Sequence, residues 1–75
     1  MEIRDMIRMA NQIADFFNGS GPELAVKDAA DHINKFWEPR MRTALFAYLD
    51  KGGEGLDPTI LKARSLIRRP TPLAA

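Results

Sequence analysis

The chain has 75 residues, of which 45% are hydrophobic and 28% are charged, a composition that fits one globular domain and leaves no room for a second. It contains no cysteine, which excludes disulfides, thiolate metal sites, iron–sulfur clusters and cysteine nucleophiles. The net charge of +1 conceals an asymmetry, because residues 1–39 carry four bases and seven acids whereas residues 40–75 carry seven bases and three acids.

The first predicted element is an amphipathic helix over residues 3–18. Apolar side chains fill one half of its helical wheel, and charged or amide side chains fill the other. Gly19 is expected to end this helix, because glycine readily adopts the left-handed conformation common at helix C-termini. Ser20 then fits an N-cap, and Glu23 three residues later would complete a capping box around Pro22. A second helix is therefore predicted to begin here.

The second and third predicted helices meet at a proline corner. Small apolar residues line the second helix up to its aromatic end at Trp37. Pro39 cannot continue that helix because it lacks an amide donor, yet it suits the first turn of a new one. The third helix is predicted to end at the Gly52–Gly53 pair, and its main apolar stripe consists of Met41, Ala44, Leu45, Tyr48 and Leu49. Because Phe46 lies off that stripe and Trp37 stands at the corner, we expect one or both to be partly exposed.

A short fourth helix is predicted after the glycine-rich loop. Asp57 and Pro58 form an N-cap and first-turn signature, and a weaker apolar pattern follows them. The last residues contain two prolines and no periodicity, so we expect an extended, flexible tail. The sequence thus predicts an all-α fold, a compact bundle of three helices plus a short C-terminal fourth helix and an extended tail. The single helical domain is expected over residues 1–68 and the tail over residues 69–75.

The residue types that carry chemistry form no recognisable catalytic or metal site. His32, the only histidine, lies beside Asp31 and four residues after Asp28. A metal site needs further nitrogen or sulfur ligands, and nucleophilic catalysis needs a serine or cysteine within helical reach, so His32 is interpreted as a boundary residue that bonds Asp28 or reaches a partner. The GGEG segment lacks the lysine and hydroxyl residue of a phosphate-binding loop and fits a chain reversal instead. We predict no catalytic, cofactor-binding or metal-binding residues.

The sequence also argues against nucleic-acid and membrane partners. A recognition helix needs basic and polar residues on one exposed face, whereas the third predicted helix is largely apolar. Arg68 and Arg69 suit a solvated end or a clasp on an acidic partner. No apolar run approaches the roughly 18 residues of a membrane span, and the N-terminus interleaves acids and bases where a signal peptide is apolar. We therefore expect a cytoplasmic protein.

The aromatic side chains are a large apolar set for so short a chain. A core of this size buries roughly four aromatic rings, and the sequence contains Phe16, Phe17, Phe36, Trp37, Phe46 and Tyr48. Aromatic and arginine residues occur together in the segment FWEPRMR at residues 36–42, as they do in the anchors of protein interfaces. This combination favours a protein that functions by docking on a partner.

Three segments carry a family resemblance. They are MANQIADFF at residues 9–17, ADHINKFWEPRMR at residues 30–42 and LDKGGEGLDP at residues 49–58. In this order and spacing they resemble the delta subunit of bacterial NAD-dependent formate dehydrogenase, the soluble molybdenum-containing type. The run H-x-x-K-F-W-x-P-R-M is the most specific of these features, whereas the sequence beyond about residue 68 lies outside the resemblance.

The resemblance implies a small accessory subunit of an enzyme that oxidises formate and passes electrons to NAD. It places the molybdenum cofactor, the iron–sulfur clusters and FMN on larger partner subunits, and it implies none on this chain. The expected role is stabilisation or assembly of the complex, with the molybdenum-bearing subunit as the expected partner. Two alternatives stay open, a transient assembly factor for molybdenum-cofactor insertion and a small helical regulator.

The corner and the glycine loop are together predicted to form the docking surface. A second copy of the chain is the expected occupant of that surface when the protein is isolated, which would give a homo-oligomer. The predicted interface residues are His32, Lys35, Phe36, Trp37, Pro39, Arg40, Met41, Phe46, Gly52 and Gly53.

Overall fold

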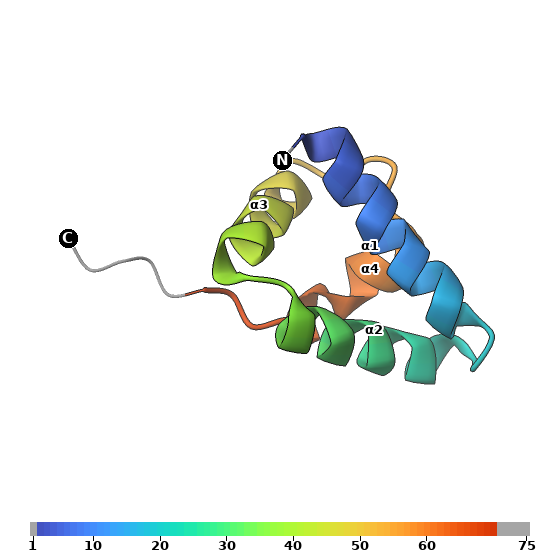
Figure 1. Cartoon of the computed structure of the whole chain (residues 1–75). Coiled ribbons are helices and arrows are strands. Elements are labelled where there is room, and N and C mark those ends of the chain that lie inside the picture. Colours follow the sequence, from blue (N-terminus) through green and yellow to red (C-terminus); the bar gives the residue numbers. More distant parts are fainter. Residues whose placement is uncertain (1, 71–75) are drawn as a thin grey trace.

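The computed structural model describes residues 2–70, and within them the regular secondary structure is entirely helical. The four α-helices are α1 (Ile3–Asn18), α2 (Pro22–Phe36), α3 (Pro39–Asp50) and α4 (Pro58–Ala63), and the 3-10 helix η1 (Arg64–Leu66) continues α4. Helices α1 and α2 form the two arms of a V, α4 lies between them, and α3 stands across the open side (Figure 1). The predicted all-α fold is therefore confirmed.

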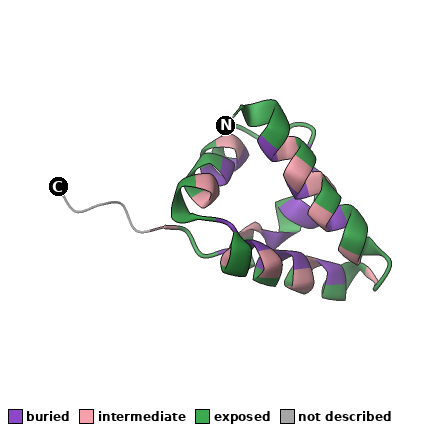
Figure 2. Ribbon diagram, viewed as in Figure 1, coloured by how far each residue is buried: buried purple, intermediate pink, exposed green. Residues whose placement is uncertain are grey.

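The centre of the fold is the contact between α1, α2 and α4. Each of these helices packs against the other two, so the short fourth helix, rather than α3, is the third member of the central core. The contact is built from small side chains, which let helix backbones approach closely; they are Ala10, Ala14, Ala29, Ala30 and Ala63. Ile33 and Ile60 are fully buried beside them, and the buried faces point inward in Figure 2.

Helix α3 packs its predicted apolar stripe inward except for Ala44, and it buries Phe46 as well. Leu45, Phe46 and Leu49 are its buried residues, whereas Ala44 is exposed. The expectation that Phe46 or Trp37 is partly exposed is wrong, because they are only 5% and 6% exposed. The C-terminal segment supplies the cover, since the Arg69 guanidinium lies 4.5 Å from the centre of the Phe46 ring.

The turn between α1 and α2 also differs from the prediction. Gly19 has a right-handed helical conformation with φ −65°, and the left-handed φ of +97° falls on Gly21. Helix α2 begins at Pro22 directly after Gly21, and no side chain caps it, so the predicted capping box of Ser20 with Glu23 is wrong. The reversal is completed within three residues, and the one that needs a positive φ is a glycine.

Three asparagines hold the segment after α3 against the first two helices. Asn11 of α1 donates to the Gly55 carbonyl at 2.9 Å and accepts from the Asp57 amide at 2.8 Å. Asn34 of α2 donates to the Leu66 carbonyl at 3.0 Å and accepts from the Arg68 amide at 2.8 Å. The third asparagine, Asn18, accepts a hydrogen bond from the hydroxyl of the buried Thr59. Asn11 and Asn34 thus satisfy backbone groups just before α4 and at the end of η1, where helical hydrogen bonds are missing.

The predicted N-cap of α4 is confirmed, because the Asp57 carboxylate accepts from the Thr59 amide at 2.9 Å.

The last described residues return to α3. Of the predicted tail, residues 71–75 lie outside the described part of the chain, while Arg69 and Pro70 line a groove against α3. Within residues 2–70, no helix combines the length and apolarity needed to cross a bilayer.

Candidate functional site

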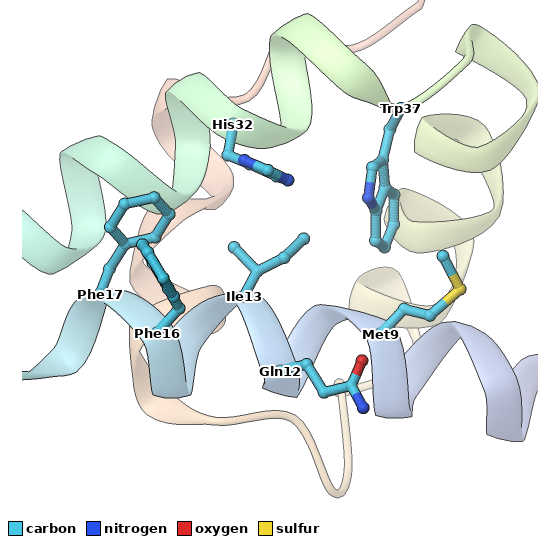
Figure 3. A pocket seen from close by; sticks show the side chains of 7 residues that line it. All are labelled: Met9, Gln12, Ile13, Phe16, Phe17, His32 and Trp37. Carbon is cyan, nitrogen blue, oxygen red and sulfur yellow. The ribbon is translucent and has the colours of Figure 1, made fainter.

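An apolar groove lies between α1 and α2 and has a volume of about 350 Å³. We call it the aromatic groove; its lining residues are Met9, Gln12, Ile13, Phe16, Phe17, His32 and Trp37. The α1 residues share one side because residues three and four apart stack along a helix. His32 enters from α2, and Trp37 closes the end of the groove at the corner before α3 (Figure 3).

Aromatic rings form a continuous row along this groove. The centres of the Phe16 and Phe17 rings are 4.9 Å apart in an edge-to-face arrangement. The His32 ring centre lies 6.1 Å from that of Phe17 and 4.7 Å from that of Phe36. These spacings are those of favourable aromatic pairs. The row therefore joins α1 to α2 across the groove.

The two ends of the row are exposed to solvent. Phe16 is 81% exposed and Phe36 is 69% exposed, the highest values among the large hydrophobic residues described. Trp37, by contrast, is buried, and its indole forms a wall of the groove. A concave apolar floor with exposed aromatic rings on its rim is typical of surfaces that bind another protein.

His32 has a packing role at this site. Its ring is half-buried between Phe17 and Phe36. Among the hydrogen bonds of residues 2–70, none joins His32 to Asp28, so that part of the sequence interpretation is not seen. Nor does the described part of the chain contain a cluster of three or more His, Asp or Glu side chains placed to hold a metal ion.

A second groove of about 930 Å³ lies between α3 and the C-terminal segment. We call it the arginine groove; it is lined by Pro39, Arg40, Arg42, Thr43, Phe46, Ala47, Asp50, Arg68, Arg69 and Pro70. Asp50 at its edge pairs with Arg64 and with Arg69, the latter at 3.3 Å. The hydrogen bond from Arg64, followed by that from Arg69, lowers the pKa of the Asp50 carboxyl below its ordinary value.

The structure divides the ten predicted interface residues among separate places. His32 and Trp37 line the aromatic groove, with Phe36 on its rim. Those that line the arginine groove are Pro39, Arg40 and Phe46. Lys35 is exposed on α2 and Met41 is half-buried against the core. The glycine pair lies in the loop after α3, where Gly52 is exposed and Gly53 is buried.

Sequence reasoning missed the α1 wall of the aromatic groove. Its residues belong to the apolar half of an amphipathic helix, a pattern that indicates a core-facing surface. The available signal was the width of that apolar half. It ends in the adjacent pair Phe16 and Phe17, whose neighbouring side chains point about 100° apart on a helix and cannot both face a narrow core.

Comparison with known proteins gives one match. The model of the family described as NADH-dependent formate dehydrogenase delta subunit FdsD matches residues 5–64. No curated protein and no solved structure matches the chain. The matched segment runs from the first turn of α1 to the end of α4, so it includes every residue that lines the aromatic groove.

Proposed function

Because the chain belongs to the NADH-dependent formate dehydrogenase delta subunit family, we propose that it is a non-catalytic accessory subunit that docks on the larger subunits of that enzyme through its aromatic groove. The partner we propose is the molybdenum-bearing subunit. The molybdenum cofactor, iron–sulfur clusters and FMN are then carried by the larger subunits, in agreement with a sequence that contains no cysteine.

The observation that carries this proposal is the exposure of Phe16, which lines the groove, and of Phe36, whose ring contacts that of the lining residue His32. Complete burial of a phenylalanine side chain contributes about 1.5–3 kcal/mol of stabilising free energy. Because both rings are mostly exposed in the free chain, most of this free energy would be gained only when a partner buries them. A partner side chain that enters the groove beside Phe16 would also contact Ile13 and Trp37. The groove thus offers the buried aromatic anchors that dominate protein-interface energies.

Affinity purification of the tagged chain from its native cells tests the proposal. Mass spectrometry would identify the co-purified subunits, and formate-dependent NAD reduction would report assembled enzyme. We expect all the larger subunits in stoichiometric amounts together with activity. Recovery of the molybdenum-bearing subunit alone would instead indicate the transient assembly factor, and recovery of no formate dehydrogenase subunit would refute both roles.

Matched variants locate the docking surface. Phe16→Ser and Phe36→Ser are expected to reduce co-purification of the larger subunits while the free chain stays folded. Leu24→Ser is the control, because Leu24 is an exposed apolar residue of α2, 54% accessible, outside the lining of the aromatic groove. If Phe16→Ser and Phe36→Ser recover as much of the larger subunits as Leu24→Ser does, docking uses another surface.

A further inference from the structure

The arginine groove is a strongly basic cleft in a nearly neutral protein. Four arginines and one aspartate line it, which leaves three positive charges without a partner of opposite charge in the lining. The aspartate is further neutralised by Arg64 from outside the lining. Among residues 2–70, no carboxylate forms an ion pair with Arg40, Arg42 or Arg68. The groove therefore attracts negative charge.

Arg42 and Arg69 are held in place before any partner arrives. Arg42 donates to the Arg68 carbonyl at 2.7 Å and to the Trp37 carbonyl at 3.4 Å. Arg69 is fixed between Asp50 and the face of the Phe46 ring. A guanidinium has five N–H donors, so both retain donors for a carboxylate. Side chains that are already ordered lose less conformational entropy on binding.

The remainder of the groove is apolar. Pro39 and Ala47 on α3 and Pro70 on the C-terminal segment contribute exposed or half-buried hydrocarbon surface to its lining. Nucleic-acid binding depends on neutralising many successive phosphates along an extended basic surface. This groove is confined to ten lining residues, contains Asp50 and is partly apolar, which suits a peptide segment that carries both carboxylates and an apolar side chain.

We propose that the arginine groove binds an acidic segment of a larger formate dehydrogenase subunit. In this arrangement carboxylates pair with Arg40 and with the free donors of Arg42 and Arg68, since guanidinium and carboxylate groups form two parallel hydrogen bonds. An apolar side chain of the segment packs on Ala47. The inference rests on the proposed function and adds a second contact, of defined chemistry, on the face formed by α3 and the C-terminal segment.

Charge-reversal variants in the full complex test this assignment. Arg40 is exposed and makes no hydrogen bond among the described residues, so Arg40→Glu should fold normally. Ala47→Glu places a carboxylate in the groove without removing an arginine. Arg4→Glu is the matched control, because Arg4 is an exposed arginine of α1 outside the groove.

We expect Arg40→Glu and Ala47→Glu to retain at least about fivefold less of the larger subunits than the control at low salt, with a smaller difference at high salt. Retention equal to that of Arg4→Glu at both salt concentrations would overturn the inference and leave docking through the aromatic groove intact. Loss of the larger subunits from the wild-type chain as well would instead refute the proposed function, and the inference with it.

Zero-length crosslinking identifies the occupant directly. Arg40→Lys keeps the charge and supplies a primary amine, which a carbodiimide couples to a carboxylate in contact with it. We expect a crosslink from residue 40 to an Asp- or Glu-containing peptide of a larger subunit, and its absence in the wild-type chain. A crosslink to a second copy of this chain, or to the chain's own terminal carboxylate, would overturn the assignment to a larger subunit.

Discussion

Truncation of Phe36 separates docking from folding. With 69% of its surface exposed, Phe36 has buried about a third of its side chain in the free protein. Complete burial contributes about 1.5–3 kcal/mol, so Phe36→Ala should lower the free energy of unfolding by only about 0.5–1 kcal/mol. The remaining two thirds, about 1–2 kcal/mol, would be gained on docking, and its loss corresponds to a 5- to 30-fold increase in Kd.

Phe46→Ala is the comparison, because Phe46 is only 5% exposed. Deleting a buried phenylalanine ring costs about 3–5 kcal/mol, which is comparable to the whole stability of a domain of this size. Urea unfolding followed by far-ultraviolet circular dichroism would measure both stabilities, and co-purification would measure docking. A Phe36→Ala variant as unstable as Phe46→Ala would place the Phe36 ring in the core. A stable variant that binds normally would show that the Phe36 ring takes no part in docking.

Three further predictions concern stability, each measured by urea unfolding. Gly53→Ala should lower the free energy of unfolding by about 1–3 kcal/mol, because Gly53 has φ +65° and an added Cβ would lie 2.7 Å from Leu61 Cδ2. Gly19→Ala is the control and should leave the free energy of unfolding unchanged, because Gly19 has φ −65° and open space around the added Cβ. Asn11→Ala should cost about 1–3 kcal/mol, since it leaves the Gly55 carbonyl and the Asp57 amide without this partner; an unchanged unfolding midpoint would show that water replaces both contacts. Because the folded-state pKa of Asp50 is lowered, its stabilising contribution is present above the ordinary carboxyl pKa and disappears as the pH falls through the folded-state value. Wild type should therefore exceed Asp50→Asn in stability at neutral pH and converge with it in acid, and a constant difference would contradict the ion-pair account.

The helix boundaries could be predicted because their signals are local. Pro22, Pro39 and Pro58 each occupy the first turn of a helix, and Asp57 caps the last one as expected. The failure at Ser20 is also local, since Gly21 between it and the proline takes the N-cap position. A pattern of residue types therefore located each helix to within a few residues.

The burial of Phe46 could not be predicted in the same way, because it depends on contacts between distant parts of the chain. Phe46 is covered by Arg69, and the C-terminal segment is held by Asn34, which is 34 residues from its partner Arg68. An asparagine on a helix has no sequence signature that distinguishes such a contact from a solvated side chain. At the candidate site the residue types of α1 again indicate only an apolar face, and the width of that face at Phe16 and Phe17 was the one signal that more than the core is contacted.

The small side chains of the central core explain why this fold leaves two of its phenylalanine rings, Phe16 and Phe36, exposed. The contact between α1, α2 and α4 is filled by alanines such as Ala10 and Ala29, which allow close packing but bury little area each. Phe16 and Phe36 stay mostly exposed, so most of the stabilisation that burial of these rings can provide would depend on a partner that covers them. Binding to the native state adds about 2.7 kcal/mol of stability at a partner concentration 100-fold above Kd. For a domain whose own core supplies about 3–5 kcal/mol, this adds roughly half to nine tenths of that stability, so occupancy of the aromatic groove would lower the already small unfolded fraction about 100-fold.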